Sequence, residues 1–183
     1  MPRDLLKVRL NEIPDRGLDV HFAPQDQRYA QMLAEVADGD GATGEARVRL
    51  ELWPSRVDLS GSMSSRLPQH CSRCLEPFDL SIEREFTQVL MRTAAPEPEL
   101  AADGELELNL RDLDKTQLVG DVVDLGEILR EELLLALPPK MLCREDCQGI
   151  CPGCGAELNS EPCTCQPETD PRWDILKQLK LDS

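Results

Sequence analysis

The segment Ala46–Trp53, ARVRLELW, has the clearest strand pattern in the chain. Its apolar side chains occupy alternate positions, and Arg47, Arg49 and Glu51 fill the positions between them. Because successive side chains of a strand point to opposite faces, this alternation predicts a strand with one buried and one solvent-exposed face. A sheet built from such strands needs another layer over its apolar face.

Similar patterns lie on both sides of this segment. After a Pro-Ser turn and again after a first cysteine pair, apolar residues recur at strand spacing: Val57, Leu59, Met63, Leu80, Ile82, Phe86 and Leu90. Residues 5–13, 17–22 and 105–110 predict three further short strands. Short alternating segments separated by turn residues favour an antiparallel meander, either open or curled into a partly closed barrel.

Helical patterns supply the second layer. Residues 27–37 carry alanines and Leu33 at helical spacing before the stop signal DGDG, and Asp124 precedes a leucine-rich stripe that ends at Pro138. Asp170 and Pro171 predict a last short helix. We therefore expect an α+β fold, with the sheet packed on one or two helices. The predicted domains are a core at 1–142, with an acidic loop at about 94–105, and a cysteine-rich appendage at 143–183.

Six of the eight cysteines lie within Cys143–Cys165, CREDCQGICPGCGAELNSEPCTC. Cysteines separated by two residues, such as Cys151 and Cys154, can both reach one Zn²⁺ with bonds of about 2.3 Å, and Gly155 lets the backbone close on the thiolates. Met1–Leu10 does not resemble a signal peptide, so we expect a cytoplasmic protein without a membrane span, where clustered cysteines favour a metal over disulfides. The segment predicts a zinc-bound knuckle.

The ligand set has alternatives. The first-choice ligands would close one tetrahedral, structural site: Cys151, Cys154, Cys163 and Cys165. Cys143 and Cys147 are alternates that can replace Cys163 or Cys165. They can instead form a second site with Cys71 and Cys74, which lie at the tip of a predicted hairpin. Thiols without any metal, at either place, are the simpler alternative.

The charge distribution bears on partners. The net charge is -15, and residues 93–132 hold 12 acidic and 3 basic residues. Such a segment repels phosphate backbones and attracts a basic partner, although a run of acidic residues is more often only a solvated face. Six aromatic residues also leave little material for stacking on bases. Direct nucleic-acid binding is disfavoured, with Arg47 and Arg49 as its best candidates and Arg84 and Arg92 as candidates on the outer face of another strand.

Catalytic signals are few. The two histidines are His21 and His70, and no phosphate-binding glycine loop or nucleophile elbow occurs. His70 could replace a neighbouring cysteine as a metal ligand. A thiol–disulfide oxidoreductase using Cys71 and Cys74 is the alternative from the enzyme class, but that chemistry uses a cysteine at a helix N-terminus, and no helix pattern follows Cys74. We therefore expect that the protein is not an enzyme.

An ordered set of motifs resembles the YceD family (domain of unknown function 177) of bacteria and plastids: CSRCLEPF at 71–78, DLGEILREELLLALP at 124–138, CQGICPGCGAELN at 147–159 with Cys163 and Cys165, and DPRWDIL at 170–176. The resemblance runs over roughly residues 45–180. It implies a non-enzymatic role in accumulation of large-subunit rRNA. Some members lack the second cysteine cluster, which implies an accessory, stabilising metal.

These observations combine into one leading hypothesis. We expect a factor in ribosome biogenesis that supports accumulation of 23S rRNA by binding a basic ribosomal protein or a pre-ribosomal particle. Ribosomal proteins are mostly basic, so an acidic factor could shield or deliver one of them.

Overall fold

The computed structural model describes residues 6–93, 116–165 and 172. The predicted acidic loop at 94–105, strand at 105–110 and terminal helix from Asp170 lie outside the described residues. The chain divides into two compact units. The first, here the sheet unit, is Met1–Gln69 with Phe78–Pro139; the second, here the cysteine unit, is His70–Pro77 with Lys140–Ser183. The hairpin tip His70–Pro77 thus groups with the cysteine-rich segment, whereas the sequence predicts a single boundary near residue 142.

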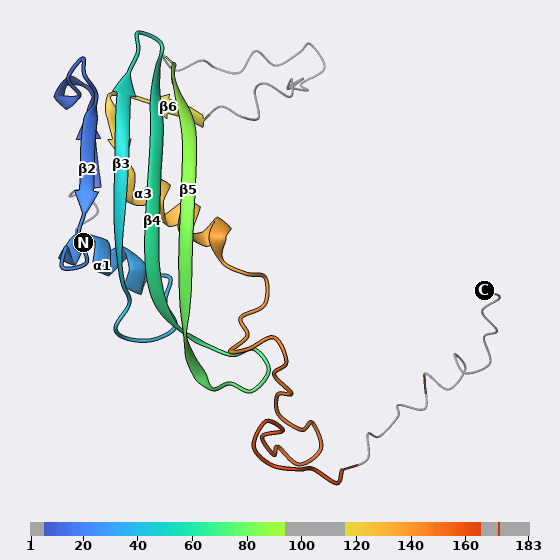
Figure 1. Ribbon diagram of the computed structural model, residues 1–183. Helices are drawn as coiled ribbons and strands as arrows, with labels where there is room; N and C mark the ends of the chain where they lie inside the picture. The colour runs from blue at the N-terminus through green and yellow to red at the C-terminus, as the bar shows by residue number, and fades with distance from the viewer. Residues whose placement is uncertain (1–5, 94–115, 166–171, 173–183) are drawn as a thin grey trace. The chain divides into compact units, whose positions relative to one another are not determined.

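The sheet unit contains an open five-stranded sheet in the order β2-β3-β4-β5-β6. Its strands are β2 (Leu18–Phe22), β3 (Thr43–Leu52), β4 (Arg56–His70), β5 (Pro77–Thr93) and β6 (Thr116–Val119). The α+β prediction is confirmed, with the sheet in its open form and not as a barrel (Figure 1). β3 pairs antiparallel with β2 and β4, while β6 runs parallel to the end of β5.

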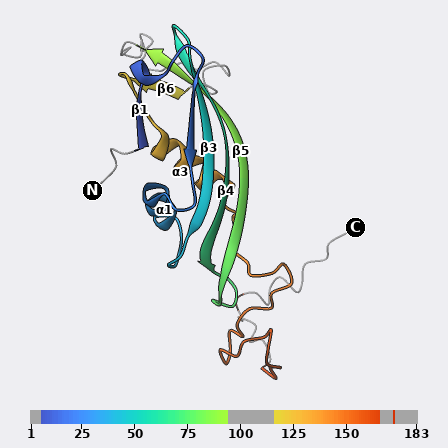
Figure 2. The same cartoon turned by 60° about the vertical axis from the view of Figure 1, so that its left-hand side comes forward.

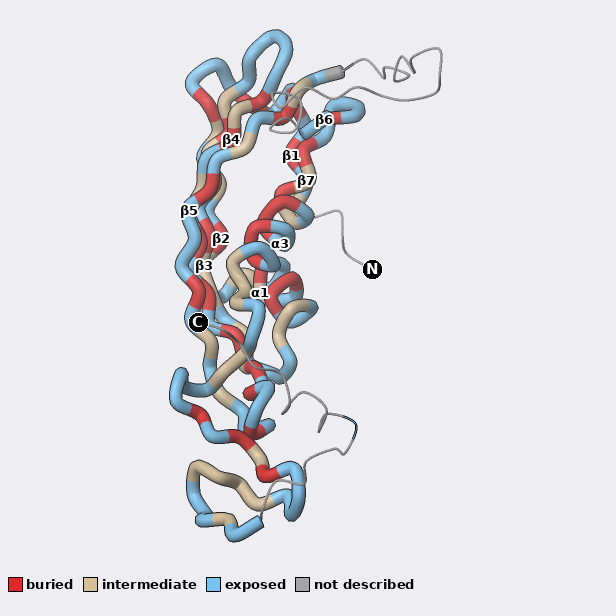
Figure 3. Tube along the Cα trace, turned by 90° about the vertical axis from the view of Figure 1, so that its right-hand side faces the viewer, coloured by how far each residue is buried: buried red, intermediate tan, exposed pale blue. Residues whose placement is uncertain are grey.

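One face of the sheet is covered. Helices α1 (Gln27–Ala34) and α3 (Leu125–Ala136) lie on the same side of it, as the edge-on view in Figure 3 shows. A separate ribbon of β1 (Lys7–Arg9) and β7 (Val122–Asp124) lies on that side too (Figure 2). The strand predicted at residues 5–13 is β1, which is shorter than expected because the chain continues as the 3-10 helix η2 (Leu10–Glu12).

The alternation in the sequence matches the observed burial. On β3, Ala46, Val48 and Leu50 are at most 3% exposed, and on α3 Leu125, Leu129 and Leu133 are at most 1% exposed. Both helices begin at an aspartate whose carboxylate accepts a hydrogen bond from the first turn: Asp26 from the Arg28 N–H and Asp124 from the Glu127 N–H. No helix in the described ranges is long and apolar enough to cross a membrane.

The absence of a side chain at Gly61 of β4 leaves room for the ring of Phe86 on β5. Gly61 pairs with Val48, and a Cβ atom at Gly61 would lie 2.5 Å from Cζ of Phe86 and 2.8 Å from the carbonyl oxygen of Arg47. We expect Gly61→Ala to lower the free energy of unfolding by about 1–2 kcal/mol, because an overpacked core must shift a ring against a neighbouring backbone. Urea unfolding measures this. The control Ser62→Ala, at the next and exposed position, should change it by less than about 0.5 kcal/mol.

Candidate metal centres

The cysteine unit contains two groups of four cysteines whose sulfur atoms all lie within 4.8 Å of one another. The hairpin tetrad is Cys71, Cys74, Cys143 and Cys147, and the terminal tetrad is Cys151, Cys154, Cys163 and Cys165. The structure thus brings together the four first-choice ligands. It places Cys143 and Cys147 with the hairpin pair rather than as substitutes for Cys163 or Cys165. Neither group includes His70.

The sulfur–sulfur distances fit tetrahedral thiolate coordination. They are 3.7 Å for Cys71–Cys147 and for Cys74–Cys143, 3.5 Å for Cys154–Cys163 and 3.3 Å for Cys151–Cys163. Four ligands at zinc–sulfur distances of about 2.3 Å stand about 3.8 Å apart in a regular tetrahedron. A disulfide needs about 2.05 Å, and all eight cysteines are free thiols. The donor set and its size therefore suit a metal ion.

Each tetrad begins with the same backbone turn. In the terminal tetrad, the Gly155 N–H donates to the Cys151 carbonyl at 2.9 Å and the Gly153 N–H donates to the Cys151 sulfur at 3.4 Å. In the hairpin tetrad, the Leu75 N–H donates to the Cys71 carbonyl at 2.9 Å and the Arg73 N–H to the Cys71 sulfur at 3.5 Å. Both turns are thus knuckles of one geometry.

The two knuckles differ in the residue that closes them. Gly155 has φ +76°, which glycine adopts freely. Leu75 has φ 63° at the equivalent position and is the one non-glycine residue with positive φ among the described residues. An L-residue in this region costs roughly 1 kcal/mol. Because Leu75 replaces this glycine, the sequence signal of the hairpin knuckle is weak. The structure identifies the knuckle by its backbone hydrogen bonds: Cys71 N–H donates to Glu76 O, as Cys151 N–H donates to Ala156 O.

The segment after Cys143 is fixed to the hairpin tip by backbone contacts within the cysteine unit. Ser72 N–H donates to Met141 O at 2.7 Å, and Ile150 N–H donates to Arg73 O at 3.1 Å. Arg73 also donates from Nη1 to Cys147 O at 2.7 Å. Gly149, with φ +76°, allows this approach, since a Cβ atom there would lie 2.9 Å from Arg73 O. Cys143 and Cys147 reach the hairpin cysteines because of these contacts.

The backbone amides prepare one thiolate in each tetrad. Burial alone raises the pKa of Cys71, but N–H groups of Cys74, Cys143 and Arg73 outweigh it and lower that pKa to about 6. The N–H groups of Cys154 and Gly153 lower the pKa of Cys151 to about 6. In contrast, the neighbouring Cys163 and Cys154 thiols raise the pKa of Cys165 to about 12. Four adjacent thiolates therefore need a cation to balance their charge.

The two tetrads differ in exposure. In the hairpin tetrad Cys143 is exposed and the other three cysteines are at most 5% exposed, whereas in the terminal tetrad Cys154 and Cys165 are exposed and Cys151 alone is buried. A four-thiolate site leaves no coordination position for a substrate, so either tetrad would stabilise structure rather than activate a water molecule. With a metal bound, the hairpin tetrad would crosslink the β4–β5 hairpin tip to residues 143–147, and the terminal tetrad would hold residues 151–165 together.

The part of the chain that contains the cysteines is also the part that matches known proteins. A family model described as "Large ribosomal RNA subunit accumulation protein YceD" matches residues 59–180, which include all eight cysteines. The chain belongs to the YceD family. Named plant proteins are among the sequences similar to this chain. No solved structure matches the chain significantly.

The relatives cover different shares of their own length. An uncharacterized protein of Mycobacterium tuberculosis (strain H37Rv) is 30% identical over 147 residues, which are 80% of this chain and 67% of the relative. The chloroplastic "Large ribosomal RNA subunit accumulation protein YCED homolog 1" is 26% identical in Zea mays and 25% identical in Arabidopsis thaliana. These matches cover 61% and 77% of this chain, but 45% and 50% of the plant proteins.

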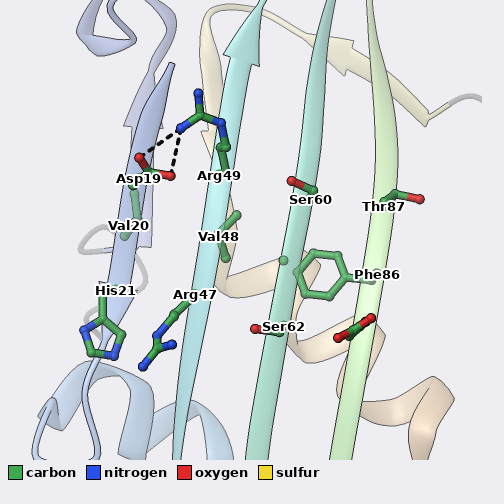
Figure 4. A pocket seen from close by; sticks show the side chains of 12 residues that line it. Asp19, Val20, His21, Arg47, Val48, Arg49, Ser60, Ser62, Phe86 and Thr87 are labelled. Atoms are coloured by element: carbon green, nitrogen blue, oxygen red, sulfur yellow. Dashed lines mark hydrogen bonds and ion pairs between the residues drawn. The ribbon is translucent and has the colours of Figure 1, made fainter. Parts of the chain in front are cut away.

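The outer face of this YceD-family sheet carries the arginines that the sequence singles out. Arg47 and Arg49 lie on the outer face, as predicted, beside Ser60 and Ser62 (Figure 4). Arg49 is balanced by Asp19 at 3.0 Å and by a Glu51 oxygen at 2.9 Å, and Arg47 lies 3.8 Å from Glu45. The arginines of β3 are therefore neutralised locally and do not form a free basic strip.

The outer-face prediction for Arg84 is wrong. Arg84 shares the side of β5 that carries Ile82 and Phe86, and its Nε atom donates to Glu132 of α3 at 3.1 Å. Gln88 donates to the other oxygen of Glu132 at 3.0 Å. The alternation of apolar and polar residues along a strand does not show whether a charged side chain faces solvent or an opposite charge on a helix that covers the sheet. Arg92 donates to the Pro54 carbonyl at the end of the sheet.

Proposed function

We propose that the chain is a non-enzymatic factor in ribosome biogenesis that supports accumulation of large-subunit (23S) rRNA. It would act in the cytoplasm by binding a basic ribosomal protein or a pre-ribosomal particle. The observation that carries this proposal is the YceD family match over residues 59–180. Two plant relatives bear the corresponding name, and the match extends over parts of both units rather than over the cysteines alone.

Charge supports a protein partner. The net charge of -15 attracts a basic protein, and the locally balanced arginines of β3 offer little to an RNA backbone. The sulfur atoms of the eight cysteines lie in two groups of four, an arrangement that suits closed structural metal sites. A binding role is therefore better supported than turnover of a small substrate.

We also propose that the ion in both tetrads is Zn²⁺. All-thiolate, tetrahedral donor sets suit zinc, which has no redox chemistry of its own and prefers four ligands in structural sites. Its contribution would be stability of the cysteine unit. The donors would be the four sulfur atoms of each tetrad, with the amide groups of Gly153 and Arg73 orienting the first sulfur of each knuckle.

Depletion of the chain in its host cells tests the main proposal. We expect the ratio of 23S to 16S rRNA to fall, and precursors of the large subunit to accumulate in sucrose gradients. The tagged chain should sediment with these precursors or recover a ribosomal protein in a low-salt pull-down. An unchanged rRNA ratio together with no ribosomal partner at low salt would contradict the proposal. Rescue by Ser62→Ala provides the matched control, since this exposed change leaves both tetrads and the core intact.

A further inference from the structure

Strand β5 lies at the edge of the sheet for most of its length. It runs from Pro77 to Thr93, but β6 pairs only with Leu90–Thr93 (Figure 1). Among the described residues, Phe78–Val89 has β4 on one side and no strand on the other. The opposite edge strand, β2, has only five residues. Within the part of the chain that the structure describes, β5 is therefore the one long open edge of the sheet.

The hydrogen-bond register shows which backbone groups face outward. Cys71 N–H donates to Glu76 O at the tip of the β4–β5 hairpin, and Arg92 N–H donates to Ser55 O at its far end. Both bonds fit one register without a bulge. In an antiparallel ladder, residues bonded to the neighbour alternate with residues whose N–H and C=O point away. The outward positions are thus the odd-numbered residues from Asp79 to Val89.

Backbone irregularity does not protect this edge against added strands. Exposed edges are commonly blocked by proline, a bulge or short length, and none of these interrupts Phe78–Val89. Its protection is charge. Glu83 and Glu85 are exposed and make no ion pair with any described residue, whereas Asp79 pairs with Arg66. Two copies meeting edge to edge would oppose glutamates, while a basic strand would gain from them.

We propose that the β5 edge, Phe78–Val89, binds an extended lysine- or arginine-rich segment of a partner protein as an additional strand. The backbone of the odd-numbered residues supplies the hydrogen bonds, and Glu83 and Glu85 select basic side chains at alternate positions. The inference rests on the basic protein partner proposed above, and it assigns that partner a binding surface and a backbone conformation.

The test uses the full zinc-loaded chain and a fluorescent ten-residue peptide of alternating lysine and valine. We expect binding by fluorescence anisotropy at low salt, weakened about tenfold or more when Glu83→Lys and Glu85→Lys are combined. Of two peptides methylated on the lysine nitrogens or on the valine nitrogens of the backbone, one should lose binding and the other should retain it, because only one edge of the peptide strand faces β5. Hydrogen exchange should show new protection at odd-numbered amides from Asp79 to Val89, because the even-numbered amides are already bonded to β4.

Thr87→Pro supplies a backbone-specific variant. Proline removes an outward N–H group without removing a bond to β4, a place where edge strands tolerate it. We expect at least about a tenfold loss of peptide affinity. Thr87→Val, which keeps the N–H group, should bind as the original chain does. If Thr87→Pro fails to fold, Ser81→Pro and the exchange pattern of the original chain still decide the matter.

Several results would overturn the edge proposal: equal binding by folded Thr87→Pro and Thr87→Val, equal binding of an alternating glutamate–valine peptide, or new protection confined to β2. Failure of the proposed function is distinguishable. Peptide binding at β5 with no ribosomal protein in the pull-down would leave the edge in place and remove the proposed partner. Equal recovery of a ribosomal protein by the original chain and Thr87→Pro would remove the edge and retain the function.

Discussion

Protein purified without added metal should contain two zinc ions per chain, and Cys71→Ser and Cys151→Ser should each remove one of them. Each substitution takes one thiolate from a different group of four. A three-thiolate site leaves the remaining sulfur atoms uncompensated and the geometry open. Elemental analysis measures the metal content directly. The Ser72→Ala variant, an exposed change at the hairpin tip, should retain both ions.

The hairpin tetrad should have the larger effect on stability. Structural zinc contributes on the order of 10 kcal/mol of apparent folding free energy in small zinc domains. Cys71 and Cys147 are almost fully buried, so a metal at their site would hold the hairpin tip and residues 143–150 together where water has little access. We expect Cys71→Ser to abolish the protected amides of residues 140–150 in hydrogen exchange, and Cys165→Ser to affect mainly residues 151–165.

A chelator should show the same order. The terminal tetrad has two exposed cysteines and the hairpin tetrad has one, so we expect the terminal tetrad to release zinc first. A thiol-reactive dye then counts four reactive thiols before the remaining four. One zinc ion per chain, loss of both ions from each single variant, or simultaneous release would contradict two independent sites. A metal content near zero would remove the zinc proposal altogether.

The sequence could predict the terminal tetrad, but it leaves open whether Cys143 and Cys147 group with it or with the hairpin pair. Cys151 and Cys154 are close in sequence, and their spacing with Gly155 is a local signal. The hairpin tetrad joins Cys74 to Cys143 across more than sixty residues, and spacing alone cannot select among such long-range partners. That choice follows from backbone contacts such as Ile150 N–H to Arg73 O, which no local pattern contains.

Strand periodicity is equally informative where each face has one chemical character. On β3, apolar and charged residues alternate, and the inner and outer faces follow. On β5, the same rule fails at Arg84, because the inner face includes a polar cluster with Glu132 and Gln88. The parallel pairing of β6 with β5 and the separate β1–β7 ribbon also depend on long-range connections, for which the sequence has no periodic signal.

Arg84→Ala should lower the free energy of unfolding of the sheet unit by about 2–3 kcal/mol. Glu132 is 5% exposed, and its carboxylate accepts hydrogen bonds from Arg84 and Gln88. Breaking a buried pair costs about 3–5 kcal/mol when it leaves a charge without a partner, and the 42% exposure of the Arg84 side chain reduces that cost. Urea unfolding followed by circular dichroism measures the change.

Substitution of Glu132 should reduce stability less than substitution of Arg84. After Glu132→Gln, the half-exposed Arg84 can turn to water, and the amide still accepts a hydrogen bond from Gln88, so we expect a loss of about 1 kcal/mol. Replacing both partners, Arg84→Met with Glu132→Leu, should return the stability to within about 1 kcal/mol of the original, because buried pairs are often replaced by apolar side chains at little cost. A double-mutant cycle of Arg84→Met, Glu132→Leu and their combination measures the coupling, and additive losses would show that the pair is not coupled. Restoration by the apolar pair would show that Glu132 demands a partner for its charge and is not retained because the pair stabilises the fold.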